Sequence, residues 1–66
     1  MKHITATNSE IEHKISEKIH SDRDRRILRL RLIDGLTFEK IGEEMQMSPR
    51  YLRTLVKRLT PILEIS

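Results

Sequence analysis

The 66-residue chain has no cysteine and no tryptophan, and it has one phenylalanine, one tyrosine, two glycines and two prolines. The absence of cysteine excludes disulfides and cysteine-based metal sites as sources of stability. With so few aromatic residues, the hydrophobic core must be aliphatic. A chain of this length buries only about 60% of its unfolded surface. Its stability must therefore come from packed helices, a partner subunit or a bound ligand.

Long hydrophobic runs are also absent. No stretch approaches the roughly 18 apolar residues of a membrane span. Residues 1–8 are polar and lack the apolar segment of a secretion signal. We therefore expect a soluble, cytoplasmic protein that makes no membrane contact.

The residue combinations that carry catalysis are not found in the sequence either. Glu43 and Glu44 are neighbours that point apart on a helix, so they cannot act as a catalytic carboxylate pair. There is no nucleophile–base pair and no phosphate-binding glycine loop. Metal-ligand spacing is missing from the three histidines, which are His3, His13 and His20. The sequence predicts that the protein is not an enzyme and needs no cofactor.

Positive charge is concentrated near the C-terminus. The net charge is +3 and the isoelectric point is about 9.7. Residues 48–60 contain four Lys or Arg and no acid, whereas residues 37–47 contain three Glu and one Lys. A basic stripe along one helix is typical of nucleic-acid binding.

Hydrophobic spacing predicts an all-α protein, a small four-helix domain over residues 9–66 that follows a flexible lead-in over residues 1–8. Ser9 and Glu12 have the spacing of a capping box, so we expect the first helix to start there. The stripe Ile11, Ile15 and Ile19 marks one apolar face of that helix. We expect this stripe in the core, and the alternative is the seam of a homodimer.

A second helix is expected over residues 22–33, after a cap at Ser21, and Gly35 stands where a C-terminal glycine is common. Its apolar residues point in several directions, which predicts a central helix. They are Ile27, Leu28, Leu30, Leu32 and Ile33. We expect its arginines to form a solvated face, in which the aliphatic stems can be buried while the charges stay in water, with DNA-backbone or polymerase contact as the alternative. These are Arg23, Arg25, Arg26, Arg29 and Arg31.

Two further helices with a tight turn between them predict a helix-turn-helix over residues 37–60. Thr37 is a favourable N-cap for a helix over residues 38–45. Ser48 should cap the next helix, with Pro49 in its first turn. Pro61 is expected to stop or kink that helix, and the alternative is that residues 61–65 add a last apolar turn.

Gly42 supports this interpretation, because glycine within a helix lowers stability by about 1 kcal/mol and needs a reason such as close packing. Apolar residues surround it at the positions that would wedge the two helices together. They are Ile41, Met45, Met47, Leu52 and Leu55.

The last helix would be the recognition helix, with its N-terminal residues at base edges in the major groove. Arginine can pair with guanine, and threonine can hydrogen-bond a base or contact a thymine methyl group. Lys57 and Arg58 are better placed for phosphates, and free N–H groups after Thr37 could hold another phosphate. The candidate DNA-binding residues are Thr37, Pro49, Arg50, Arg53, Thr54, Lys57 and Arg58.

Three segments together resemble region 4 of sigma factors of the sigma-70 family. They are residues 27–32 (ILRLRL), 36–45 (LTFEKIGEEM) and 48–55 (SPRYLRTL). The resemblance implies a helical domain that binds the −35 promoter element and touches RNA polymerase. It would assign base contacts to Pro49, Arg50 and Thr54, where the family commonly has Arg, Glu and Gln. These departures imply a different sequence preference.

The spacing around Gly42 and Ser48 is similar to LuxR-type DNA-binding domains as well, and small phage or mobile-element regulators fit the size. We expect a sequence-specific DNA-binding transcription regulator, whose partners are double-stranded DNA and RNA polymerase. Two alternatives stay open. One is a protein-interaction module that binds polymerase or another regulator through Glu39, Glu43 and Glu44. The other is a DNA-packaging or replication component.

Overall fold

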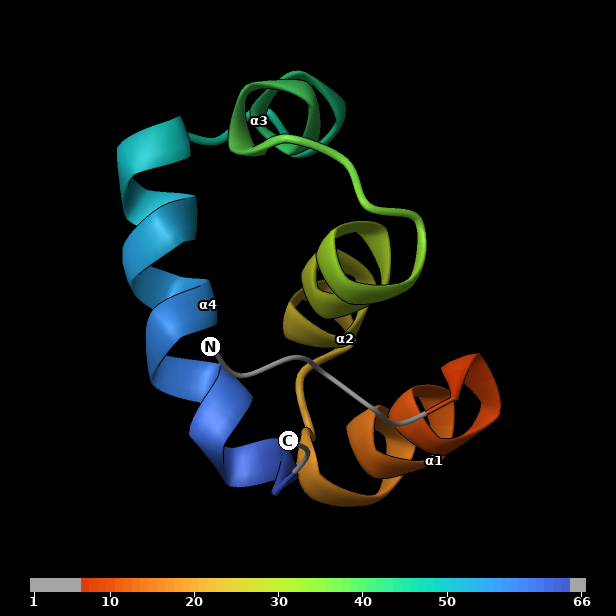
Figure 1. The fold of residues 1–66 in the computed structure, drawn as a ribbon. Coiled ribbons are helices and arrows are strands. Elements are labelled where there is room, and N and C mark those ends of the chain that lie inside the picture. Colours follow the sequence, from red (N-terminus) through yellow and green to blue (C-terminus); the bar gives the residue numbers. More distant parts are fainter. Residues whose placement is uncertain (1–6, 65–66) are drawn as a thin grey trace, which may run out of the picture.

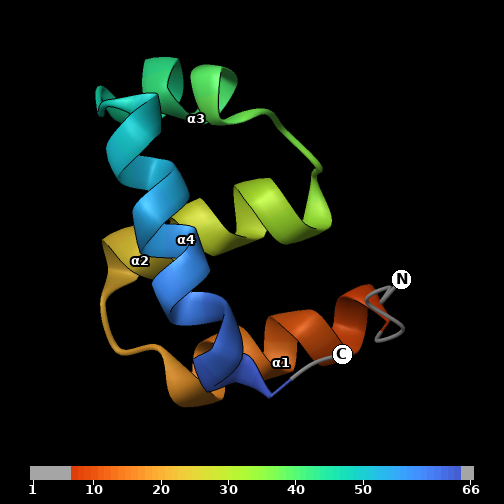
Figure 2. The ribbon, with the colours of Figure 1, turned by 60° about the vertical axis from the view of Figure 1, so that its left-hand side comes forward.

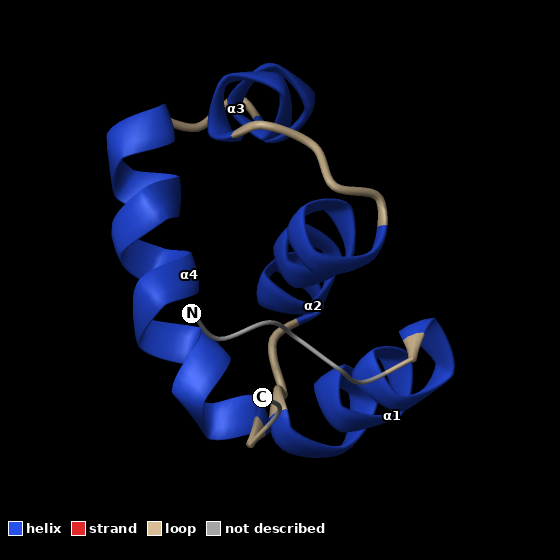
Figure 3. Ribbon diagram, viewed as in Figure 1, coloured by secondary structure: helices blue, strands red, loops and turns tan. Residues whose placement is uncertain are grey.

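A computed structural model describes residues 7–64 of the chain, all of whose regular secondary structure is helical (Figures 1 and 3). This confirms the all-α fold class. Residues 1–6, most of the expected lead-in, lie outside the described part. The elements in chain order are α1 (Asn8–Lys18), α2 (Asp22–Leu28), the π-helical segment η1 (Arg29–Ile33), α3 (Phe38–Met45) and α4 (Pro49–Leu63).

Helix α1 begins two residues earlier than a cap at Ser9 would place it. The capping box is formed by Thr7 and Glu10: the Thr7 hydroxyl accepts from the Glu10 N–H at 3.2 Å, and the Thr7 N–H donates to the Glu10 carboxylate at 3.0 Å. The expected cap at Ser9 is wrong, because Ser9 lies inside the helix. Its partner Glu12 forms an ion pair with Arg29 of η1 instead.

The Thr7 cap makes the start of α1 sensitive to acid. Hydrogen bonds from the Thr7 backbone and hydroxyl, together with the charge of Lys14, hold the pKa of Glu10 below its ordinary value. A lowered folded-state pKa stabilises the domain above the unfolded pKa, and this stabilisation is lost as pH falls through the folded value. We expect Glu10→Gln, which keeps an acceptor, to melt below wild type at pH 6, and we expect this difference to shrink as pH falls below the ordinary range of a carboxyl group. A difference that is the same at neutral and at acidic pH would contradict the assignment.

The apolar stripe of α1 lies in the core, as expected. Ile11, Ile15 and Ile19 are 2%, 0% and 4% exposed. They are therefore not available as a dimer seam.

Two arginines from the next elements, Arg25 of α2 and Arg29 of η1, fix α1 in place. Arg25 donates from Nη2 to the Ser16 carbonyl at 3.0 Å and from Nε to the Ile19 carbonyl, which satisfies carbonyls at the end of α1.

Helix α2 and η1 form the centre of the molecule, in contact with α1, α3 and α4 (Figure 1). The Ser21 hydroxyl accepts from the Asp24 N–H at 3.3 Å, which confirms the expected cap. Ile27 and Leu28 are fully buried, and the apolar residues of η1 pack partly buried around them. The last turn is wider than in an α-helix, since the Asp34 N–H donates to the Arg29 carbonyl five residues back. Gly35 follows with φ +71° and reverses the chain toward α3.

The connection between α3 and α4 is a tight turn through Gln46, which adopts a left-handed conformation. The N–H of Met47 donates to the Gly42 carbonyl at 2.9 Å, and the N–H of Gln46 donates to the same carbonyl. Gly42 is required here, because a Cβ at this position would lie 2.6 Å from the Met47 carbonyl oxygen and 3.5 Å from the Pro49 ring. The expected close approach at Gly42 is confirmed. The group that comes nearest to Gly42 is the Met47 carbonyl of the turn.

Helix α4 continues through Pro61 to Leu63, so Pro61 does not stop the helix, and the last apolar turn is formed. Pro61 has no N–H to donate to the carbonyl of Lys57, so the helix lacks this one backbone hydrogen bond. The Thr60 hydroxyl donates to the Val56 carbonyl at 2.7 Å, which satisfies an acceptor in the same turn. Continuation of the helix buries the Leu63 side chain completely. The free energy of this burial offsets the loss of the backbone hydrogen bond at Pro61.

Helices α1, α2 and α4 form the core together with Ile41 of α3. Helix α4 passes in front of α2, and its C-terminal end reaches α1 (Figure 2). Lys18 and Glu64 pair at 3.5 Å at this junction. The buried side chains are Ile11, Ile15, Ile19, Ile27, Leu28, Ile41, Leu52, Leu55, Val56, Leu59 and Leu63. None of the helices described is long and apolar enough to cross a membrane.

Candidate nucleic-acid interface

Helix α4 divides into a buried face and a basic face. Leu52, Leu55, Val56 and Leu59 are buried as expected, and the remaining side chains of residues 49–58 are exposed. No ion pair forms between an acidic group and the α4 cations within residues 7–64, although such pairs form on the other helices. The four cations are Arg50, Arg53, Lys57 and Arg58. Their charge is therefore available to an anionic partner.

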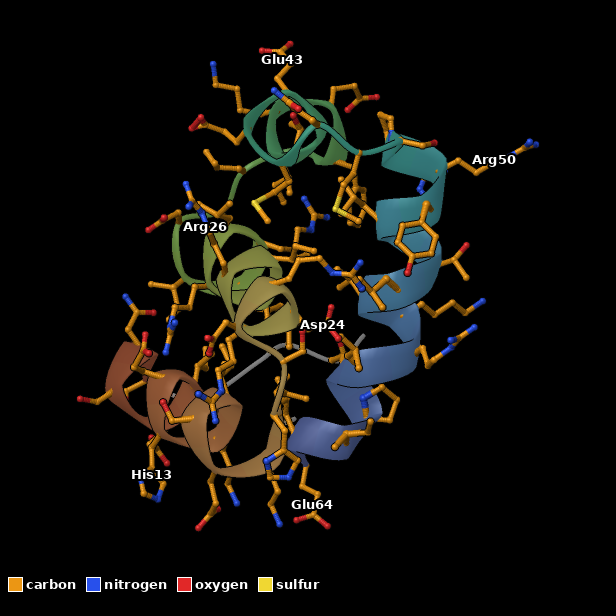
Figure 4. The ribbon with its side chains drawn as sticks, turned by 180° about the vertical axis from the view of Figure 1, so that it is seen from behind. His13, Asp24, Arg26, Glu43, Arg50 and Glu64 are labelled. Atoms are coloured by element: carbon orange, nitrogen blue, oxygen red, sulfur yellow. The ribbon has the colours of Figure 1, made fainter. Side chains whose placement is uncertain are left out.

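Arg50 stands in the first turn of α4 and extends away from the rest of the molecule (Figure 4). Its side chain is exposed and hydrogen-bonds to no other group in the described structure. Pro49 precedes it and occupies the first helical position, where the missing N–H is not needed. Ser48 holds the N-cap position, but its side chain makes none of the expected capping hydrogen bonds.

Arg53 differs from Arg50 because it has an intramolecular partner. Its guanidinium carbon lies 5.6 Å from the centre of the Phe38 ring, and that of Arg31 lies 4.3 Å from the same ring. These are distances at which cation–π attraction operates. Arg53 is thus held near the beginning of α3.

Thr54 lies one helical turn after Arg50 on the exposed side of α4. Its hydroxyl donates a hydrogen bond to the Arg50 carbonyl at 3.2 Å. Lys57 and Arg58 follow in the next turn and are both exposed. Residues 50, 54, 57 and 58 share one stripe, since side chains four and seven or eight positions apart lie on one face of a helix.

Thr37 caps α3 by accepting a hydrogen bond from the Lys40 N–H at 3.1 Å. The first N–H groups of any helix have no partner within it, so the exposed start of α3 presents donors beside the Arg53 side chain. Arg31 closes the preceding loop by donating from Nη1 to the Leu36 carbonyl at 2.9 Å. The guanidinium groups of Arg31 and Arg53 both lie near the ring of Phe38, the residue that follows Thr37 in the chain.

Tyr51 is 46% exposed and its hydroxyl interacts with Arg23 at the start of α2. Nε and Nη2 of Arg23 donate hydrogen bonds to the Asp24 carboxylate at 3.2 and 3.0 Å. The Asp24 carboxylate, and after it the Tyr51 hydroxyl, raise the pKa of Arg23.

Most of the arginines of α2 and η1 are used inside the domain. Arg25 binds the end of α1, Arg29 pairs with Glu12, and Arg31 binds the Leu36 carbonyl. Arg26 is exposed and points outward (Figure 4). No local sequence pattern indicates these pairings, because each joins residues five to seventeen positions apart. Arg29 and Arg31 are partly buried, and their charged groups bind partners inside the domain as well as facing solvent.

The exposed side of α3 is acidic, in contrast to α4. Glu39, Glu43 and Glu44 are exposed, and Glu43 points away from the body of the molecule in a different direction from Arg50 (Figure 4). A shallow open groove runs between α3 and the start of α4, lined by Glu39, Gly42, Glu43, Met47 and Pro49. Pro49 therefore packs at the edge of this groove, and it is less free than Arg50 to reach a base.

Within residues 7–64, no group of three or more acidic or histidine side chains could hold a metal ion. The model of the family described as "Sigma-70, region 4" matches residues 21–58, which include α2, η1, α3 and most of α4. No curated protein and no solved structure matches the chain significantly.

Proposed function

The chain belongs to the sigma-70 region 4 family of DNA-binding helix-turn-helix domains, and we propose that it is a sequence-specific transcription regulator. The observation that carries the proposal is the exposed basic stripe of α4, whose cations have no acidic partner in the described structure. In this family of motifs the second helix of the pair enters the major groove. Here that helix is α4, and it is preceded by a turn that Gly42 keeps tight.

Affinity would come largely from phosphates. Lys57, Arg58 and Arg53 would neutralise backbone charges along the groove, and the first N–H groups of α3 after Thr37 would hold one more phosphate. Arg50 and Thr54 would face base edges in the major groove of the DNA, and Pro49 would lie against the wall of that DNA groove. The identities at positions 49, 50 and 54 differ from the common region 4 residues, so we propose a target other than the usual −35 element. Contact with RNA polymerase through another surface of the domain belongs to the same proposal.

A titration of random-sequence duplex DNA at two salt concentrations tests the proposal. Neutralisation of about five phosphates gives a slope of log K against log salt near −4 to −5. We expect Arg50→Ala/Arg53→Ala to weaken binding about tenfold or more at low salt and to make the slope shallower. Arg26→Ala removes an exposed cation from α2 and serves as the matched control, with a much smaller effect. Absence of binding at low salt by folded protein would exclude the proposal.

The acidic face of α3 supports a second candidate, a module that binds a basic protein partner such as a segment of polymerase. Charge reversal separates the two functions. Glu39→Lys/Glu43→Lys would leave DNA binding intact or strengthen it, and Arg50→Glu/Lys57→Glu would abolish it. If only Glu39→Lys/Glu43→Lys changed the activity of the protein in transcription, we would assign protein interaction, and not DNA recognition, as its function. Recognition of two half-sites would require a dimer formed through a surface other than the buried isoleucine stripe of α1.

A further inference from the structure

Two neighbouring side chains on the exposed stripe of α4 have complementary chemistry. Arg50 has no partner in the described structure and points outward, so its five N–H donors are free. Thr54 stands four residues later on the same face, and its hydroxyl donates to the Arg50 carbonyl at 3.2 Å. The hydroxyl hydrogen of Thr54 is therefore already used within the helix.

The group that Thr54 leaves for an external partner is its methyl group. Threonine has only two non-hydrogen substituents on Cβ besides the backbone, and one of them, the hydroxyl oxygen, is turned back toward the helix. An exposed methyl group on a major-groove helix can recognise the 5-methyl group of thymine by apolar contact. A free guanidinium can bind guanine O6 and N7 through two parallel hydrogen bonds.

We propose that α4 reads a guanine through Arg50 and, within a base step or two of it, the methyl group of a thymine through Thr54. This inference rests on the proposed function and adds the chemistry of the target. The rise of one helical turn is about 5.4 Å, and successive nucleotides of a strand are about 3.4 Å apart. Side chains one turn apart therefore reach base pairs that are adjacent or separated by one other.

The hydrogen bond from Thr54 to Arg50 also explains why the pair acts together. It leaves the hydroxyl able to accept but not to donate, so the hydroxyl cannot bind adenine N7 or the guanine acceptors, and we assign the base preference at that position to the methyl contact. Arg53 lies near the Phe38 ring, and Lys57 and Arg58, further along the stripe, are assigned to phosphates. The two base-reading side chains of the stripe are then Arg50 and Thr54.

The test begins with selection of a preferred site from random duplexes, followed by replacement of each thymine in that site with deoxyuridine. This change removes one methyl group and preserves base pairing. We expect wild type to lose about fourfold in affinity at one thymine, the value of one buried methyl group. Thr54→Ser, which keeps the hydroxyl, should show no such loss at that position. Thr54→Val, which keeps a methyl group, should still discriminate.

The guanine contact is tested in the same duplex by 7-deazaguanine, which lacks the N7 acceptor. Wild type should lose affinity when one guanine within two base pairs of the sensitive thymine is replaced. The affinity of Arg50→Ala should not change with this replacement. DNA binding that is insensitive to deoxyuridine everywhere, or equally sensitive in Thr54→Ser, would overturn the inference and leave the proposed function standing. No DNA binding by wild type would overturn both. Thermal melting of each variant verifies that the exposed substitutions leave the fold intact.

Discussion

Gly42→Val is expected to destabilise the domain by about 2–3 kcal/mol and to lower its melting temperature by about 10–20 °C. A Cβ at Gly42 would lie 2.6 Å from the Met47 carbonyl oxygen. This oxygen belongs to the backbone of the turn, so it cannot move aside as a flexible side chain would. The added methyl groups must push the turn outward and displace α4 from α3. Thermal unfolding followed by circular dichroism measures the effect.

Glu44→Val is the matched control for this prediction, since it introduces the same β-branched side chain at an exposed position of the same helix. We expect a change within about 0.5 kcal/mol. Any folded fraction of Gly42→Val should also bind DNA more weakly, because α3 and α4 no longer keep their relative positions. A melting temperature equal to that of the control would show that the turn is not as tight as described.

Ile15→Ala is expected to lower stability by about 3 kcal/mol, within the range for deletion of a fully buried aliphatic side chain. Ile15 is 0% exposed and lies in the middle of α1. The family match begins at residue 21, after α1. The contacts of α1 with η1, α2 and α4 nevertheless make it part of the same core. A stability of roughly 3–10 kcal/mol is normal for 66 residues, so this single change should remove a large share of it.

His13→Ala provides the comparison for Ile15→Ala on the opposite side of α1. The His13 side chain is 73% exposed and its only described ionic partner is Glu17 at 3.8 Å. Exposed pairs of this kind contribute at most about 1 kcal/mol. Chemical denaturation of both variants measures the difference. If Ile15→Ala were as stable as His13→Ala, α1 would be an appendage and the minimal domain would begin at α2.

The ends of α3 and the start of α4 were predictable from the sequence because they depend on local chemistry. Thr37 satisfies an N–H three residues later, and Pro49 fits only the first turn of a helix. The start of α1 was not decidable in this way. Thr7 with Glu10 and Ser9 with Glu12 both have capping-box spacing, and the ion pair between Glu12 and Arg29 is formed only in the folded domain.

The continuation of α4 past Pro61 depends on tertiary structure as well. Local preference favours a stop at Pro61, but the buried position of Leu63 at the junction with α1 favours another turn. The same reason explains Arg53: its spacing places it on the exposed face, and its attraction to Phe38 appears only when α3 and α4 are assembled. The expected burial of the α1 isoleucines and the exposure of Arg50, Lys57 and Arg58 are confirmed, while the DNA contacts of these residues stay predictions.

Mapping of the DNA-binding surface by nuclear magnetic resonance tests the central claim most directly. The amide signals of uniformly ¹⁵N-labelled protein would be followed during titration with duplex DNA. We predict the largest shifts at residues 50–58 of α4 and around Thr37, with little change along α1. Shifts confined to α1 or to the acidic face of α3, with α4 unaffected, would contradict the assignment of α4 as the recognition helix.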